Sequence, residues 1–272
     1  MARSALTISL VEQARGGPFV FWHDLAAACR ETARLGFDGL EIFSPGPEGL
    51  KQQDYGNTLK AHGLKLAALG TGGGWLLHRL TLTSPDATIR SKAIEFVKGL
   101  IDAGAEFAAP AILGSLQGRH GEGVDQATAM NYLADSLHTL SRHAQARGTF
   151  LLFEPLNRYE SNLVKTLAEG RELCEKVGAG DSLKLLADLY HMNIEEVGLA
   201  AELSKCGALL GHVHLADSNR RPGGCGHTAF EPIGQALKKI DFNGFVSAEC
   251  LPWPDSLTAA QKTAETFTRY FR

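Results

Sequence analysis

Four side chains that could bind a metal follow one another along the second half of the chain, each at the end of a strand-like apolar run. They are Glu154, Asp188, His214 and Glu249. The intervals between them are 34, 26 and 35 residues, and one eighth of the 272-residue chain is also 34 residues. Three carboxylates and one imidazole suit a divalent cation such as Mn²⁺, Co²⁺ or Mg²⁺ better than a structural zinc. A single carboxylate in such a position is often a helix cap, but three that converge without a cation would be strongly destabilising.

The elements that must position these ligands alternate along the whole chain. Short β-type runs alternate with helical patterns, which is typical of βαβ units and a parallel sheet. Eight such pairs predict a single (β/α)8 TIM barrel that spans residues 1–272 as one domain, with the four ligands at the carboxyl ends of strands. The predicted strands are Leu6–Val11, Gly39–Phe43, Lys65–Gly70, Ala109–Leu116, Phe150–Leu156, Leu183–Leu189, Leu209–Leu215 and Phe245–Cys250.

The predicted helices follow the strands in turn. Ser84 is expected to cap the third helix, because Pro85 suits the first helical position. The longest irregular stretches, Ser44–Gly49, Gly70–Thr83, Leu116–Val124 and Ser218–Ala229, are expected to form loops on one rim of the barrel. The helices are expected at Phe21–Leu35, Gly49–His62, Ser84–Ala103, Asp125–Ala146, Thr166–Val177, Glu195–Lys205, Phe230–Ile240 and Leu257–Phe271.

Composition limits the class of protein and of partner. The net charge of −3 and the pI of about 6.4 give no support for a nucleic-acid or membrane-surface partner. No apolar stretch reaches the roughly 20 residues that span a bilayer, and the first ten residues lack the features of a signal peptide. The five cysteines are odd in number and have no CxxC spacing, which indicates reduced thiols in a cytoplasmic protein. Cys225 and Cys250 lie near the predicted site, but a nucleophilic role is not favoured.

Further polar side chains follow the ligands at short offsets. Glu160 follows Glu154 by six residues, His191 follows Asp188 by three, and Arg220 follows His214 by six. Each would lie on the loop just beyond its ligand and could contact a bound molecule, although Glu160 and Arg220, each taken alone, would be interpreted as solvated loop charges.

His212 lies two residues before His214, so the two imidazoles share one face of their strand. His212 is therefore expected one layer deeper, as a hydrogen-bonded core histidine.

These residues carry a family resemblance. The chain resembles the xylose isomerase-like TIM barrels, and within them the ketose 3-epimerases and hydroxypyruvate isomerase-like enzymes. The resemblance implies that Glu154, Asp188, His214 and Glu249 bind one metal ion, preferably Mn²⁺, with Co²⁺ and Mg²⁺ as alternatives. It also implies that Glu154 and Glu249 act as acid and base, and that Glu160, His191 and Arg220 hold substrate. The matching motifs are Glu154-Pro-Leu-Asn-Arg-Tyr-Glu160, Asp188-Leu-Tyr-His191, His212-Val-His214-Leu-Ala-Asp-Ser-Asn-Arg220 with Pro222-Gly223, and Ala248-Glu249.

The chain departs from the epimerases on the side where substrate would bind. The segment after Pro222, the end of the fourth strand and the glycine-rich loop Gly72–Trp75 are unlike theirs, so the identity of the sugar stays open. Five side chains in these regions could contact substrate or simply face solvent, and Trp75 could stack on a sugar or pack over the barrel. They are Trp75, His78, Gln117, Arg119 and His227.

The resulting hypothesis is a divalent-metal-dependent sugar isomerase or epimerase that removes a proton α to a ketose carbonyl through an enediolate. The same scaffold could instead serve a lyase or dehydratase of a keto-sugar or keto-inositol. A remote alternative is an apurinic DNA endonuclease of the endonuclease IV type, and a metal-free binding protein is a further one. The expected partner is a small-molecule sugar, and relatives suggest a homo-oligomer, either a dimer or a tetramer.

Overall fold

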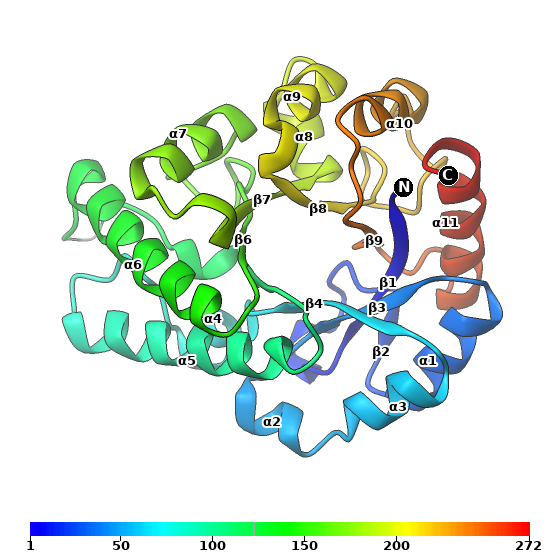
Figure 1. The fold of residues 1–272 in the computed structure, drawn as a ribbon, viewed down its shortest axis with the longest axis horizontal. Helices are drawn as coiled ribbons and strands as arrows, with labels where there is room; N and C mark the ends of the chain where they lie inside the picture. The colour runs from blue at the N-terminus through cyan, green and yellow to red at the C-terminus, as the bar shows by residue number, and fades with distance from the viewer. Residues whose placement is uncertain (122) are drawn as a thin grey trace.

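The computed structural model describes residues 1–121 and 123–272, and within them parallel strands close into a barrel surrounded by helices (Figure 1). The strand order is β2-β1-β3-β4-β5-β6-β7-β8-β9, and pairing of β1 with β9 closes the ring. The predicted TIM barrel is therefore confirmed. The ring consists of β1 Arg3–Ser9, β3 Gly39–Phe43, β4 Lys65–Gly70, β5 Ala111–Leu113, β6 Leu151–Phe153, β7 Leu183–Asp188, β8 Leu210–His214 and β9 Phe245–Ala248, and the short β2 Phe21–Trp22 lies beside β1.

Alternation along the strands decides which side chains face the helices and which face the barrel interior. On β3, Leu40 and Ile42 belong to the large apolar core that includes residues of the surrounding helices, whereas Glu41 lies between them and therefore points the other way. Small separate clusters such as Ala68, Ile112, Leu152 and Leu186 combine residues from β4, β5, β6 and β7. The barrel thus carries an apolar outer layer and a narrower interior that also accepts polar side chains.

The helices form the ring that Figure 1 shows around the strands. They are α1 Leu25–Arg34, α2 Pro47–Lys51, α3 Tyr55–Ala61, α4 Gly73–His78, α5 Ala87–Ala105, α6 Gln126–Ala146, α7 Leu167–Val177, α8 Leu189–Glu195, α9 Leu199–Cys206, α10 Phe230–Lys239 and α11 Ser256–Tyr270.

Two predicted helix starts were wrong. The first helix begins at Leu25 rather than Phe21, because Phe21–Trp22 pairs with β1 and Asp24 caps the helix by accepting from the Ala27 N–H. The cap of α5 is Asp86, whose carboxylate accepts from the Thr88 N–H, whereas the hydroxyl of Ser84, two residues earlier, accepts from the Asp86 N–H. Both true caps are aspartates, which compete with serine for this position on equal terms.

Other boundaries also differ from the prediction. The helix expected over Gly49–His62 is two helices, α2 and α3. The stretch Gly70–Thr83 contains α4, so it is not wholly irregular. The predicted loop Leu116–Val124 includes residue 122, which lies outside the described residues.

Two further sequence expectations can be compared with the structure. All five cysteines lie in the described part of the chain, and none forms a disulfide. Within that same part, no helix combines the length and the apolar character that a membrane crossing requires.

Candidate metal centre

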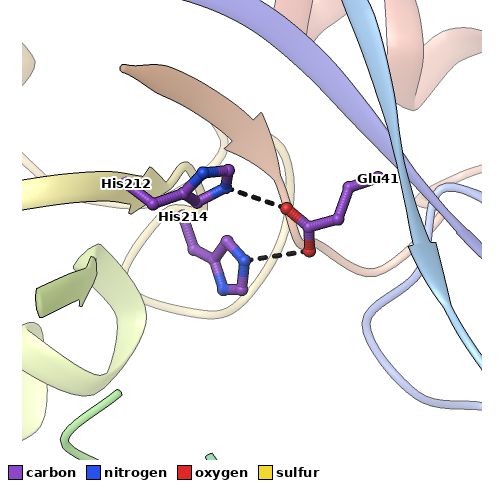
Figure 2. A group of neighbouring side chains, drawn as sticks. All are labelled: Glu41, His212 and His214. Carbon is purple, nitrogen blue, oxygen red and sulfur yellow. Dashed lines mark hydrogen bonds and ion pairs between the residues drawn. The ribbon is translucent and has the colours of Figure 1, made fainter. Parts of the chain in front are cut away.

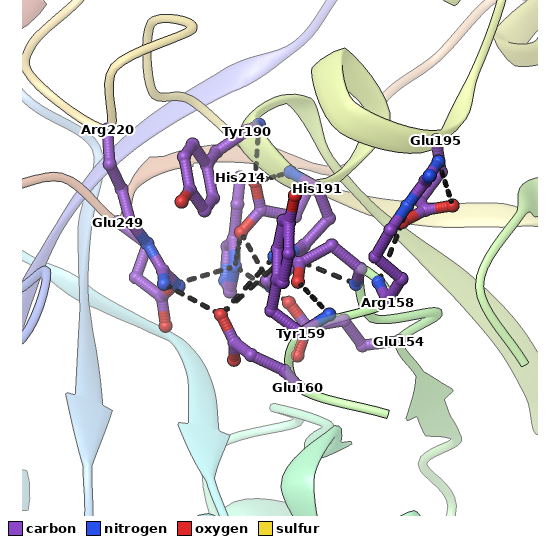
Figure 3. A network of polar contacts seen from close by, with 12 residues as sticks. Glu154, Arg158, Tyr159, Glu160, Tyr190, His191, Glu195, His214, Arg220 and Glu249 are labelled. Atoms are coloured by element: carbon purple, nitrogen blue, oxygen red, sulfur yellow. Dashed lines mark hydrogen bonds and ion pairs between the residues drawn. The ribbon is translucent and has the colours of Figure 1, made fainter. Parts of the chain in front are cut away.

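The structure brings the four predicted ligands together at the carboxyl ends of four adjacent strands. Asp188 and His214 are the last residues of β7 and β8, while Glu154 and Glu249 directly follow β6 and β9. One ligand atom from each side chain lies within 4.8 Å of the other three. Figure 3 shows three of them, Glu154, His214 and Glu249, within one network of polar contacts.

The geometry of this cluster is centred on Nδ1 of His214. This atom lies 3.4 Å from Oε1 of Glu154 and 3.7 Å from both Oδ2 of Asp188 and Oε2 of Glu249. His214 Nδ1 and Asp188 Oδ2 are buried and have no hydrogen-bond partner among the described residues. Ligand atoms around one cation with bonds of about 2.0–2.2 Å have separations of this size. The donor set and its two unpartnered atoms therefore fit a single divalent ion.

Local structure fixes the direction of each carboxylate. Asp188 is also the N-cap of α8, because its Oδ1 accepts from the N–H groups of Tyr190 and His191 at 2.6 and 3.3 Å. That bond leaves Oδ2 directed at the cluster. Glu154 lies against Gly114, where any Cβ would collide with Oε2 of the glutamate. A ligand that also serves as a cap loses little conformational freedom when the ion binds.

A second polar layer lies beneath the ligands and was missed by the sequence reasoning, except for His212. Figure 2 shows Glu41 reaching from β3 toward His212 and His214. Its two oxygens lie 2.8 Å from His212 Nε2 and 3.0 Å from His214 Nε2, and all three side chains are buried. The prediction of a deeper, hydrogen-bonded His212 is confirmed. The signal that could have identified Glu41 is a charged residue within the apolar strand Gly39–Phe43.

The three predicted substrate contacts border the ligand cluster. Arg220 donates to Oε1 of Glu160 at 3.1 Å and to Oε2 of Glu249 at 3.0 Å, and its guanidinium lies over the Tyr190 ring (Figure 3). His191 lies on the buried face of the helix α8 and not on a loop as expected, because Asp188 starts that helix directly after β7.

Asn157 fixes the tautomer of His191. The Asn157 Oδ1 accepts from the Tyr159 N–H, so its amide nitrogen faces His191 Nδ1 at 2.7 Å. An amide nitrogen can only donate, which places the imidazole proton on Nε2. That nitrogen lies 3.7 Å from Oδ2 of Asp188 and can donate toward the centre of the site.

Asp217 shapes the loop that carries Arg220. This buried carboxylate accepts from the backbone N–H groups of Ser218, Gly224 and Thr228. Arg220 adopts φ +59°, which is uncommon for a residue with a side chain, and its carbonyl accepts from the Leu251 N–H. The loop is thus held by backbone contacts that no residue spacing could reveal, although Asp217 lies within the motif quoted above.

The five side chains whose role was open occupy different environments. Trp75 and His78 lie exposed on α4, and Arg119 and His227 are exposed on the loops after β5 and β8. Gln117 is fully buried, donates to the Glu154 carbonyl and accepts from the Val164 N–H. Both ends of its amide are occupied by the chain, so Gln117 supports the backbone at Glu154.

Burial and neighbouring charge shift the pKa values of the ligands in different directions. Burial, together with the nearby Glu154 and Asp188, raises the pKa of Glu249 to about 8 against the opposing effect of His214 and Arg220. Burial also acts to raise the pKa of Asp188, but the attraction of His191, His214 and Arg220 outweighs it and holds that pKa below its ordinary value. For His214, burial lowers the pKa, but the surrounding carboxylates raise it well above the ordinary 6.5.

Substitution of Gly114 tests how closely Glu154 must be seated. In Gly114→Ala the added methyl group would displace the Glu154 carboxylate, and we expect Mn²⁺ affinity to fall by about tenfold or more, as for other residues that orient ligands. Titration calorimetry of the metal-free protein measures this. Gly198→Ala is the control, because its Cβ would meet only ordinary contact with Ala201. Equal affinities for the two variants would show that the contact between Gly114 and the Glu154 carboxylate does not influence metal binding.

The affinity for metal should depend on pH. At neutral pH the raised pKa values of Glu249 and His214 leave protons on the site that a cation must displace. We therefore expect Mn²⁺ affinity to rise from about pH 6 to about pH 8, by up to roughly tenfold per pH unit for each proton displaced. Calorimetry in buffers of different ionisation enthalpy measures both the affinity and the protons released.

The stability of the metal-free protein should change in the opposite sense. Both pKa values are higher in the folded chain than in the unfolded chain, so the stability these groups contribute at low pH is lost as the pH rises, for Glu249 between about 4.5 and 8. The fall in melting temperature over this range should be smaller in Glu249→Gln. Metal binding without proton release, at an affinity independent of pH, would contradict this account of the site.

Comparison with known proteins gives a consistent result. The family model described as a xylose isomerase-like TIM barrel matches residues 29–269. A D-psicose 3-epimerase from Ruminiclostridium cellulolyticum is 31% identical over 229 residues, which are 80% of this chain and 75% of that protein. A hydroxypyruvate isomerase-like protein from Streptomyces coelicolor is 29% identical over 242 residues, 82% of this chain and 84% of its own length.

Solved structures show the same fold. A D-allulose 3-epimerase from Methylomonas sp., solved in complex with D-allulose, superposes with a TM-score of 0.81 at 25% identity and covers 99% of this chain and 98% of its own. The family match spans most of the chain, and the relatives are epimerases and isomerases. The chain therefore belongs to the xylose isomerase-like TIM barrel family and is an enzyme of the isomerase and epimerase kind.

Proposed function

We propose that this enzyme is a divalent-metal-dependent ketose epimerase or isomerase, whose reaction begins with removal of the proton α to the ketose carbonyl. The observation that carries the proposal is the convergence of Glu154, Asp188, His214 and Glu249, with two buried ligand atoms that have no hydrogen-bond partner in the part of the chain that the structure describes. Buried carboxylates in contact with one another are costly unless a cation balances them. The names of the relatives, D-psicose 3-epimerase among them, support a ketose as the substrate class.

The four ligands are proposed to hold one ion. Mn²⁺ is the preferred candidate, with Co²⁺ and Mg²⁺ as alternatives, because oxygen-rich sites with one imidazole suit these cations. When bound, such an ion supplies Lewis-acid polarisation of a substrate carbonyl. Asp188 and His214 have no other assigned role in the proposal, since Asp188 is held as a helix cap and His214 is anchored from below by Glu41.

Glu154 and Glu249 are proposed as the two proton carriers. One removes the α proton from the substrate, which leaves an enediolate, and the other returns a proton to the opposite face of the same carbon. The pKa of Glu249, raised to about 8 in the metal-free protein, suits a group that exchanges protons near neutral pH. If the proton is instead removed from the terminal carbon next to the carbonyl and a proton is delivered to the carbonyl carbon, the product is an aldose, so isomerisation would use the same two carboxylates.

The substrate is proposed to be held by Glu160, His191 and Arg220. Arg220 can only donate, the His191 tautomer presents an N–H toward the centre, and Glu160 can accept from a hydroxyl. This mixture of donors and acceptors matches a ketose, whose one carbonyl accepts hydrogen bonds and whose hydroxyls both donate and accept. Because Arg220 also contacts Oε2 of Glu249, it can keep that carboxylate oriented while substrate binds.

Two alternative activities lose support. A lyase or dehydratase would need a leaving group β to the same carbon, and no relative reported above is named for one. An apurinic endonuclease is disfavoured by the acidic pI of about 6.4 and by relatives that act on sugars.

We further propose that the barrel over residues 1–272 acts as one domain in the cytoplasm, as a dimer or tetramer of identical chains, with no nucleic-acid or membrane partner.

Solvent exchange tests the proposed reaction directly. The metal-loaded protein is incubated in deuterium oxide with a panel of free ketoses, 3-keto-sugars and keto-inositols. We expect Mn²⁺-dependent conversion of at least one compound, with one deuterium at the carbon next to the carbonyl, observed by NMR. The same conversion without deuterium would exclude exchange-competent proton carriers, and the absence of conversion across the panel would overturn the proposed substrate class.

The Glu249→Gln variant separates chemistry from binding. Loss of one acid–base group is expected to lower kcat by about 10²–10⁴-fold and, because Glu249 is also a ligand, to weaken Mn²⁺ binding. Rates are therefore compared at saturating metal, and metal content is measured in parallel. Wild-type turnover in this variant would remove Glu249 from the mechanism.

The Arg220→Ala variant tests the substrate contact. An arginine that binds substrate through charged hydrogen bonds is expected to raise KM by about tenfold or more while kcat changes less. The control is Arg158→Ala, because Arg158 is a nearby arginine that instead pairs with Glu195 and is largely exposed (Figure 3). A KM that stays the same in Arg220→Ala, measured on the substrate found by the exchange screen, would withdraw the assignment.

A further inference from the structure

We propose that Glu41 is a positioning residue that fixes the tautomer of His214 and so keeps Nδ1 free to bind the cation. This inference rests on the proposed metal centre and adds to it a residue that does not itself bind the metal. Glu41 lies on β3, on the far side of β1 and β9 from β8, so it approaches His214 across the barrel interior (Figure 2).

Each carboxylate oxygen of Glu41 makes one contact with an imidazole. Its Oε1 lies 3.0 Å from His214 Nε2 and its Oε2 lies 2.8 Å from His212 Nε2. Only 4% of the surface of Glu41 is exposed to solvent. Among the described residues, no other group makes a hydrogen bond with this carboxylate. Each oxygen therefore has one imidazole partner.

The chemistry of these contacts determines where the proton sits. An ionised carboxylate can only accept hydrogen bonds, so a neutral His214 must carry its proton on Nε2. The lone pair is then on Nδ1, which is the atom that faces Glu154, Asp188 and Glu249 and that has no hydrogen-bond partner within residues 1–121 and 123–272. A carboxylate behind a metal-binding imidazole in this way also raises its basicity and holds its ring orientation.

His212 gives the carboxylate of Glu41 a fixed orientation. His212 and His214 lie on the same face of β8, with Val213 between them on the other face, and their rings are nearly perpendicular. A carboxylate with a single partner could rotate about its last bond, whereas one held at both oxygens cannot. Glu41 is thus aligned by the deeper imidazole and in turn aligns the upper one.

Glu41, His212 and His214 could instead form a second cation site, since their ligand atoms also lie close together. The geometry favours the positioning role, because both oxygens of Glu41 are already matched one to one with imidazole nitrogens at hydrogen-bond length. Metal stoichiometry distinguishes the two: one cation per chain agrees with the positioning role, and two per chain would overturn it.

The Glu41→Gln variant provides the main test. Its amide keeps the shape of the carboxylate but has no negative charge and only one accepting oxygen. His214 must then either face the N–H₂ group and shift its proton to Nδ1, or keep a neutral acceptor that raises its basicity less than a carboxylate does. We expect the Kd for Mn²⁺ to rise by about 10–100-fold, measured by calorimetry on a variant with a native circular dichroism spectrum. The control is His212→Gln, which keeps Glu41 and supplies a donor to it, and its Kd is expected to stay within about threefold of wild type. A wild-type Kd in Glu41→Gln would overturn the proposal.

A second measurement does not depend on metal or activity. Nitrogen NMR of metal-free wild-type protein labelled in histidine, recorded at alkaline pH where the ring is neutral, reports the tautomer of His214. Spectra of His212→Gln and His214→Gln identify the signals of these two residues among those of the ten histidines. We expect the Nε2–H form, and an Nδ1–H form would overturn the role of Glu41 even if Glu41→Gln fails to fold. If the protein binds no divalent cation but shows the Nε2–H form, the proposed function fails while the positioning by Glu41 stands.

Discussion

The constraint on which the site depends is the electrostatic cost of placing three carboxylates around one buried imidazole nitrogen. Glu154, Asp188 and Glu249 each approach His214 Nδ1 to within 3.4–3.7 Å, and Glu154, Asp188 and His214 are buried. Such a group is stable only when protons or a cation balance its charge. In the metal-free protein the pKa values of Glu249 and His214 are raised, so these groups retain protons that offset the negative charge of the carboxylates.

The surrounding structure holds this cluster from two sides. From the barrel interior, Glu41 makes a hydrogen bond with Nε2 of His214. On the rim, Arg220 donates hydrogen bonds to Glu249 and Glu160. Both neighbours carry charge, and both are themselves held, Glu41 by His212 and Arg220 by a loop that Asp217 organises. The ligands are therefore set in place before any ion arrives, which is the condition for tight binding at low entropic cost.

Much of the fold and the ligand set could be predicted because both are periodic in sequence. The repeat of strand and helix predicts the barrel, and a polar residue at the end of an apolar strand predicts a place on its catalytic rim. The errors had local causes. Asp86 competes with Ser84 for the capping position of α5, and Phe21–Trp22 joins the sheet rather than the first helix. His191 proved to be on a helix, since the ligand Asp188 doubles as its cap.

The sequence by itself determined the kind of protein and the identities of the four proposed ligands, because these depend on residue type and on spacing along one strand at a time. Only the tertiary structure decided which residues support them. Glu41 and His214 are 173 residues apart, and their hydrogen bond exists because the barrel closes and brings the interior faces of β3 and β8 together. The placement of Arg220 over Tyr190 and against Glu249 likewise depends on the segments that follow three different strands, β8, β7 and β9. Contacts across a closed sheet have no fixed sequence interval, so residue spacing could not predict which side chains would meet.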